Sequence, residues 1–259
     1  MTPPVALLLF GLFALPLRFC EAQSSRAVDP DVGDTAEPAP IPSRKAPLEP
    51  LHVAVLDENE HPPTFVLRGG PLGPSRLVFL HGMCGHGMGY AQSFQYAAAK
   101  KGTLIAPQAD VVCGKGPWAK WSLDIEALDA RIVAAFRKLG HAGSIDDVAV
   151  IGYSQGATRA EALARRFPQR YTRLISIGAP EAPSGRGLKR VRAAVMMAGE
   201  RDRRDQMHAG VRSMTAHGIP STFILIPEAR HGAMGPTPEK TMGEALDWLW
   251  RNSKPGANE

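Results

Sequence analysis

The sequence predicts an α/β protein: a mostly parallel sheet of about eight strands with helices on both faces. Short apolar runs alternate along the chain with amphipathic segments of helical period, and turn-forming residues separate the two kinds of segment. A chain of 259 residues, 44% hydrophobic and 21% charged, can bury one large core of this class. We therefore expect one folded domain over residues 51–252 and a flexible tail over residues 253–259.

The first 22 residues are typical of a secretory signal peptide. An apolar stretch over residues 1–17, too short to span a bilayer comfortably, is followed by Cys20-Glu-Ala22, a small-x-small cleavage pattern. Cleavage after Ala27 is an alternative, and a lipoprotein signal at Cys20 is disfavoured because Arg18 and Phe19 are not small. We expect a secreted or periplasmic protein with no stable membrane insertion once the signal is removed.

Residues 23–50 are rich in proline, acidic and small residues, a composition that extends the chain and cannot bury a core, so we expect a disordered linker. The folded domain follows. Its expected strands run over residues 52–56, 64–67, 76–80, 103–106, 148–151, 174–177, 193–198 and 222–226. The first two should form an antiparallel hairpin. Helices are expected over about 90–100, 123–139, 156–167, 204–216 and 238–251.

The strongest motif is Gly152-Tyr-Ser-Gln-Gly156, which lies between the buried strand at 148–151 and a helical pattern that Pro168 ends. A serine on such a strand-to-helix turn presents its hydroxyl above the carboxyl end of the sheet, and the two glycines leave room for the turn. The pattern is weak alone, but its structural context makes Ser154 the candidate nucleophile. The alternative is a glycine-rich turn with a bystander serine.

A glycine-rich loop, Leu80-His-Gly-Met-Cys-Gly-His-Gly-Met-Gly89, follows the strand at 76–80. Such a loop leaves backbone N–H groups unpaired, which suits an oxyanion hole. We assign the donors to the N–H groups of Met83 and Gln155. Alternatively, the glycines only allow close packing.

Two more strand ends supply the remaining catalytic groups. Asp202 follows the strand at 193–198 and can accept the Nδ1 proton of a histidine, and His231 follows the last strand and can act as general base. Asp205 is the runner-up for the acid, and Asp202 could instead cap the next helix. Because the carboxyl ends of parallel strands share one edge of the sheet, these residues should meet Ser154.

With its elbow around Ser154, loop His81-Gly-Met-Cys-Gly, acid Asp202 and base His231 in this order, the sequence resembles the α/β-hydrolase family over residues 51–252. The resemblance implies an eight-stranded sheet and a hydrolase with no cofactor and no metal. It also makes His81 a loop histidine rather than the base. Residues 180–192 are too short for the helical cap of many members, so we expect an open cleft that accepts a small-molecule or polymeric ester.

Three aromatic residues are candidates for substrate binding: Tyr153, and Trp118 and Trp121 in the long segment after the strand at 103–106. The tryptophans could equally cover the core. Once Cys20 is removed with the signal, Cys84 and Cys113 remain, and they either form one disulfide or stay as two buried thiols. A disulfide would join this segment to the oxyanion loop.

The net charge of +5 is too mild to indicate a nucleic-acid partner. We therefore predict a secreted serine hydrolase that cleaves a carboxylic ester through an acyl-enzyme intermediate. A serine peptidase or aminoacyl hydrolase on the same fold, and a non-catalytic binding protein, are the alternatives.

Overall fold

The computed structural model describes residue 51 and residues 53–56, 62–68 and 75–253. The chain divides into two units, residues 1–47 and 48–259, and all described residues belong to the second. The predicted signal peptide over residues 1–22 and the predicted linker over 23–50 lie outside the described residues.

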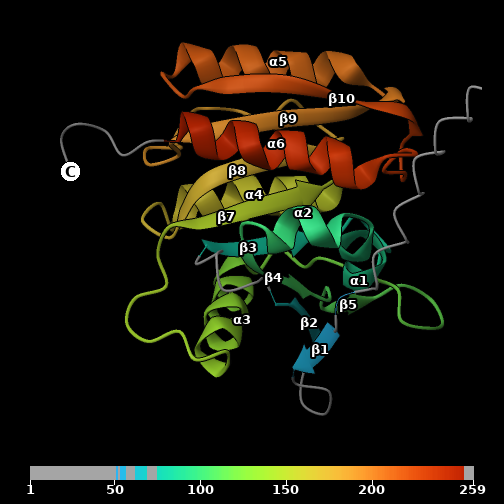
Figure 1. Ribbon diagram of the computed structural model, residues 1–259, viewed down its shortest axis with the longest axis vertical. Helices are drawn as coiled ribbons and strands as arrows, with labels where there is room; N and C mark the ends of the chain where they lie inside the picture. The colour runs from blue at the N-terminus through green and yellow to red at the C-terminus, as the bar shows by residue number, and fades with distance from the viewer. Residues whose placement is uncertain (1–50, 52, 57–61, 69–74, 254–259) are drawn as a thin grey trace, which may run out of the picture. The chain divides into compact units, whose positions relative to one another are not determined.

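Eight strands form one sheet in the order β1-β2-β4-β3-β7-β8-β9-β10 (Figure 1). They are β1 (Val53–Leu56), β2 (Thr64–Leu67), β3 (Ser75–Leu80), β4 (Gly102–Pro107), β7 (Val148–Tyr153), β8 (Tyr171–Ile177), β9 (Ala193–Arg201) and β10 (Ser221–Arg230). Strand β2 pairs antiparallel with β1 and β4, and every other pair is parallel. The predicted fold class, with about eight mostly parallel strands, is confirmed.

Helices cover both faces of the sheet. Successive residues of a strand point to opposite faces, so neighbouring residues pack against different sets of helices. Val78 packs with α3 (Ile125–Lys138), α4 (Gln155–Arg166) and α5 (Arg204–Ala216) in one apolar cluster. Phe79, its neighbour, packs with α1 (Gly87–Ala91), α2 (Gln95–Ala99) and α6 (Pro238–Asn252) in the other cluster. In Figure 1, α2 and α6 lie in front of the sheet. The connection between β8 and β9, residues 178–192, is fully described and contains no helix, so the prediction of no sizeable cap is confirmed.

The helix predicted over about residues 90–100 is wrong as a single element. The chain instead forms α1, a 3₁₀ turn (Gln92–Phe94) and α2. The break falls at Phe94, whose backbone leaves the helical region at φ −132° while its ring is buried edge-on against Phe79, with the ring centres 5.5 Å apart. Core packing of this ring therefore overrides the helical period.

Ser253, which we placed at the start of the flexible tail, is buried, and its Oγ accepts a hydrogen bond of 2.7 Å from Arg173 Nε. This contact fixes the end of α6 against β8. The rest of the predicted tail, residues 254–259, lies outside the described residues.

A second, two-stranded sheet pairs β5 (Val111–Val112) antiparallel with β6 (Ala119–Lys120). The sequence did not predict this hairpin, because two-residue strands are too short to show a period. Ala119 also forms an antiparallel bridge with Gly85, and Cys84 and Cys113 form a disulfide, the first of the two alternatives for this pair. The hairpin is therefore attached to the loop that follows β3.

The sheet has a topological switch point between β3 and β7. From β3 the chain adds β4 on one side and β7 on the other, so the strand order reverses between them. In open α/β sheets, such a switch point is where ligands bind. The residues that follow β3 and β7 are thus the first to consider for function.

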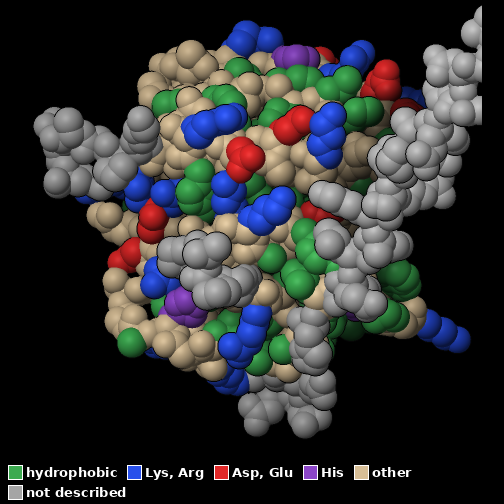
Figure 2. Space-filling model, viewed as in Figure 1, with side chains coloured by type: hydrophobic (Ala, Val, Ile, Leu, Met, Phe, Trp, Pro, Cys, Tyr) green, Lys and Arg blue, Asp and Glu red, His purple; other side chains and the backbone are tan. Residues whose placement is uncertain are grey.

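On the face that Figure 2 shows, basic side chains do not gather into one patch. In the view of Figure 2, Lys and Arg side chains are scattered among acidic, apolar and uncharged groups. Several arginines of the described chain form ion pairs, including Arg192 with Asp147 and Arg166 with Glu126. No described helix is long and apolar enough to cross a membrane.

Candidate active site

Ser154 stands at a sharp turn between β7 and α4. Its backbone adopts φ 51° and ψ −117°, a strained conformation for a residue with a side chain. The two glycines of the motif are required here: a Cβ on Gly156 would collide with the carbonyl oxygen of Leu80, and one on Gly152 would collide with the first turn of α4. The sequence motif therefore forms the turn that it predicts.

The three side chains predicted as nucleophile, base and acid lie within hydrogen-bond distance of one another. His231 Nε2 is 3.0 Å from Ser154 Oγ, and His231 Nδ1 is 2.8 Å from Asp202 Oδ2. Asp202 follows β9 and His231 follows β10, so three strand ends supply the cluster. The Asp202 side chain is largely buried, whereas that of His231 is 50% exposed.

Asp202 has a second bond that fixes its carboxylate. Its Oδ1 accepts a hydrogen bond of 2.7 Å from the N–H of Arg203, the residue before α5. The N-cap of α5 is Arg203, and no side chain caps this helix, so the alternative that Asp202 serves as its cap is wrong. Asp205, the alternative acid, lies in the first turn of α5.

Gly178, at the end of β8, is a site residue that the sequence reasoning missed. It has φ +51°, and a Cβ built on it would lie 3.0 Å from Asp202 Oδ2 and 3.4 Å from the imidazole of His231. A side chain at this position would push the Asp202 carboxylate back by a few tenths of an ångström. Its place directly after a parallel strand was the available signal, the same one that identified Asp202 and His231.

Tyr153 does not offer a surface to a substrate, contrary to our prediction. Its ring is buried, stacked on Tyr90 with centres 5.0 Å apart, and lies 5.6 Å from the ring of His231. Its hydroxyl accepts a hydrogen bond from the N–H of Gly232. Burial raises the pKa of Tyr153 to about 12, so it stays neutral. Tyr153 supports the loop that carries His231.

The predicted oxyanion loop lies against the nucleophile. A Cβ on Gly82 would be only 3.3 Å from Ser154 Cβ. Among the hydrogen bonds of the described residues, neither the N–H of Met83 nor that of Gln155 has an acceptor. Both proposed donors are therefore available to a ligand.

His81 is buried below this loop. Its Nδ1 is 2.7 Å from the carbonyl oxygen of Gly82, and its Nε2 accepts a hydrogen bond of 3.0 Å from the N–H of Ala109. This pattern requires the tautomer with its proton on Nδ1. Loss of solvation on burial lowers the pKa of His81 to about 4, so the ring is neutral near pH 7. Both nitrogens are occupied, which leaves none to act as a base.

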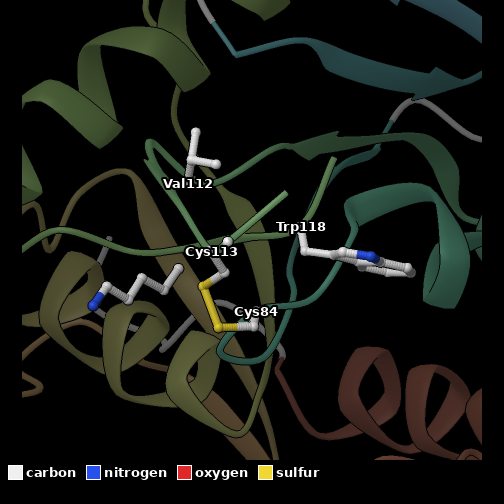
Figure 3. A pocket seen from close by; sticks show the side chains of 6 residues that line it. Cys84, Val112, Cys113 and Trp118 are labelled. Atoms are coloured by element: carbon white, nitrogen blue, oxygen red, sulfur yellow. A yellow bond between two sulfur atoms is a disulfide. The ribbon is translucent and has the colours of Figure 1, made fainter. Parts of the chain in front are cut away.

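The two tryptophans occupy opposite environments. Trp121 is 4% exposed and packs on His81, which fits the alternative that it covers the core. Trp118 is 50% exposed and lines an open hollow of about 700 Å³ with Val112 and the Cys84–Cys113 disulfide (Figure 3). The strand alternation explains the difference: Ala119 and Trp121 face the core, whereas Trp118 and Lys120 face outward.

A separate cavity of about 350 Å³ opens directly at the nucleophile. It is lined by Ser154, Gly178, Ala179, Pro180, Asp202, Arg203 and His231. The part of the chain that the structure describes contains no group of three or more His, Cys, Asp or Glu side chains that could hold a metal ion.

No protein-family model and no curated protein matches the sequence. Solved structures match its fold. An arylesterase has 15% sequence identity and a TM-score of 0.58, with 80% of this chain and 88% of that chain covered. A fluorophosphonate-binding serine hydrolase from Staphylococcus aureus has 13% identity, a TM-score of 0.54, and coverage of 72% and 91%. Zea mays acyl-protein thioesterase 2 has 18% identity, a TM-score of 0.50, and coverage of 74% and 99%. This similarity establishes the α/β-hydrolase fold.

Proposed function

We propose that the protein is a secreted serine hydrolase that cleaves carboxylic esters, with Ser154, His231 and Asp202 as its catalytic triad. The observation that carries the proposal is the continuous line of hydrogen-bond distances from Asp202 Oδ2 through His231 to Ser154 Oγ. Several solved structures of the same fold are of esterases and serine hydrolases, which supports the same chemistry here.

In the first step, His231 Nε2 takes the proton of Ser154 as Oγ bonds to the carbonyl carbon of the ester. Asp202 accepts a hydrogen bond from His231 Nδ1–H, which keeps the Nε2 lone pair directed at Ser154 and stabilises the imidazolium that forms. The C–O bond to the alcohol then breaks, and the alcohol leaves with the proton from His231. The product on the enzyme is an acyl ester of Ser154.

Met83 and Gln155 N–H groups would hold the carbonyl oxygen while it carries negative charge. One such donor is worth roughly 3 kcal/mol in the transition state. In the second half of the reaction, water attacks the acyl-enzyme with His231 again as base. The free acid is released and Ser154 recovers its proton.

The cavity at Ser154 and the hollow that Trp118 lines suggest how the ester binds. Its alcohol must face His231, which protonates it, and therefore occupies the cavity that Arg203 also lines. The acyl group then extends away from His231. Cys84, the residue after the proposed oxyanion donor Met83, lines the hollow together with Trp118 (Figure 3). We place an apolar acyl group of a small-molecule or polymeric ester there.

Secretion is part of the proposal. Its support is the apolar stretch with its cleavage pattern near Ala22 and the disulfide between Cys84 and Cys113, because disulfides persist in oxidising compartments. Comparison of the mature N-terminus with the printed sequence, after expression in a secreting host, tests it.

The activity test compares p-nitrophenyl esters of graded acyl length with p-nitroanilides of the same acyl groups. The proposal predicts that esters are cleaved much faster than anilides, and that a quenched reaction contains the acyl group on Ser154. Ser154→Ala should abolish both. Faster cleavage of anilides would instead favour a peptidase. No cleavage by folded protein would favour a binding protein.

A further inference from the structure

We propose that Trp121 is a positioning residue that holds both backbone donors of the oxyanion hole, Met83 and Gln155, in register with Ser154. The inference rests on the proposed function and extends it to a residue that does not touch the substrate. Trp121 is nearly fully buried, yet each of its polar groups is bonded to one of the two segments that carry the donors.

The side chain of Trp121 holds the Met83 side of the hole. Its indole Nε1 donates a hydrogen bond of 2.7 Å to the carbonyl oxygen of His81, and its ring packs on the His81 imidazole with centres 4.9 Å apart. His81 Nδ1 is in turn hydrogen-bonded to the carbonyl oxygen of Gly82. This carbonyl and the Met83 N–H belong to the same peptide group, so fixing one fixes the other. The orientation of the Met83 N–H thus depends on contacts that Trp121 completes.

The backbone of Trp121 holds the other side. Its N–H donates to Gln155 Oε1 at 3.0 Å, and its carbonyl accepts from Gln155 Nε2 at 3.2 Å. This pair of bonds fixes the side chain of the residue whose own backbone N–H is the second proposed donor. One residue therefore connects the end of β3 to the start of α4 directly above the sheet.

The hairpin that carries Trp121 is itself anchored on the far side of Met83. Gly85 N donates to the Ala119 carbonyl at 3.1 Å and Ala119 N donates to the Gly85 carbonyl at 3.2 Å. Cys84 is covalently joined to Cys113 (Figure 3). The side chain of Met83 is exposed and does not fix its own backbone. The Met83 N–H is therefore positioned by the contacts of its neighbours: Trp121 with His81 before it, and the bonds of Cys84 and Gly85 after it.

The consequence for catalysis is specific to the oxyanion. A backbone donor acts only if it points at the charged oxygen from about 2.7–3.1 Å, and removal of one donor lowers kcat by roughly 100–1,000-fold. Loss of the Trp121 contacts would misalign the donors without removing them. We therefore expect a smaller loss of kcat, and only for substrates whose carbonyl oxygen accepts hydrogen bonds from the two donors.

The test compares Trp121→Phe, which keeps an aromatic ring but removes the indole N–H, with Trp248→Phe on α6 as the matched control. The readout is kcat and KM for an oxygen ester and for its thionoester, in which sulfur, a poor hydrogen-bond acceptor, replaces the carbonyl oxygen. For Trp121→Phe we expect kcat for the oxygen ester to fall about 10–100-fold, which is less than the loss of kcat on removal of a whole oxyanion donor. The KM and the rate of thionoester cleavage should stay nearly unchanged. Trp248→Phe should change neither.

Gln155→Ala is a second variant, because it removes both bonds to the Trp121 backbone and keeps the Gln155 N–H. We expect Gln155→Ala to show the same selective loss of kcat for the oxygen ester. This variant serves as the test if Trp121→Phe does not fold. Equal losses with the two esters, or no loss, would overturn the inference while leaving the hydrolase intact. If wild-type protein cleaves neither ester and a fluorophosphonate does not label Ser154, the proposed function itself fails.

Discussion

Replacement of Gly178 by alanine tests how tightly the acid and base are packed. The new Cβ would lie 3.0 Å from Asp202 Oδ2 and 3.4 Å from the His231 ring. Ordinary contacts begin near 3.4 Å, so the carboxylate must retreat by several tenths of an ångström from a hydrogen bond of 2.8 Å. Misplacement of catalytic groups by about 1 Å can cost about 100-fold in rate, so we expect kcat to fall about 10-fold or more.

Alanine at this position also strains the backbone. Gly178 has φ +51°, and a left-handed conformation costs alanine about 1 kcal/mol. Gly218→Ala is the matched control, because Gly218 has φ +75° and a Cβ added there would meet nothing within 4 Å. Both variants should lose similar stability in urea unfolding, and only Gly178→Ala should lose kcat toward a p-nitrophenyl ester. If kcat of Gly178→Ala stays within twofold of wild type, or if both variants lose activity equally, the packing argument is refuted.

Three further changes should act on stability. Acidification from pH 6.5 to 4 should lower the free energy of unfolding by about 3 kcal/mol through His81 alone, because the pKa of His81 is about 4 in the folded protein and 6.5 when exposed, so the unfolded chain binds more protons. Urea unfolding at a series of pH values in this window should show the decrease, and His81→Asn should remove most of it. Cys84→Ser with Cys113→Ser should cost about 3–4 kcal/mol, from the entropy of a loop of sequence separation 29, and an unchanged urea midpoint would refute this. Asp129→Ala should cost about 3 kcal/mol and spare kcat, because it leaves the buried hydroxyl of Tyr171 without its partner at 2.8 Å; lost activity in folded protein would contradict it.

The fold could be predicted because it depends on regular patterns. Strands such as β7 are buried on both faces and therefore read as continuous apolar runs, and helices such as α5 carry one apolar stripe. The same logic brought Ser154, Asp202 and His231 to one edge of the sheet, since each directly follows or ends a parallel strand.

The rest of the site depends on contacts that no periodicity encodes. Trp121 looked like a loop aromatic, but the disulfide and the bridge from Gly85 to Ala119 turn its segment into a strand whose inner face is buried. Tyr153, the last residue of β7, is likewise buried and stacks on Tyr90, from a distant part of the sequence. Side-chain direction in such short segments follows from tertiary pairing, which the sequence pattern does not contain.

The most direct test of the account is reaction of the purified mature protein with a fluorophosphonate probe, followed by mass spectrometry of the labelled peptide. Such a probe reports an activated serine without knowledge of the substrate. We predict label on Ser154, no label in Ser154→Ala and strongly reduced label in His231→Ala. Folded wild-type protein that stays unlabelled, or that carries the label on another residue, would contradict the proposed triad.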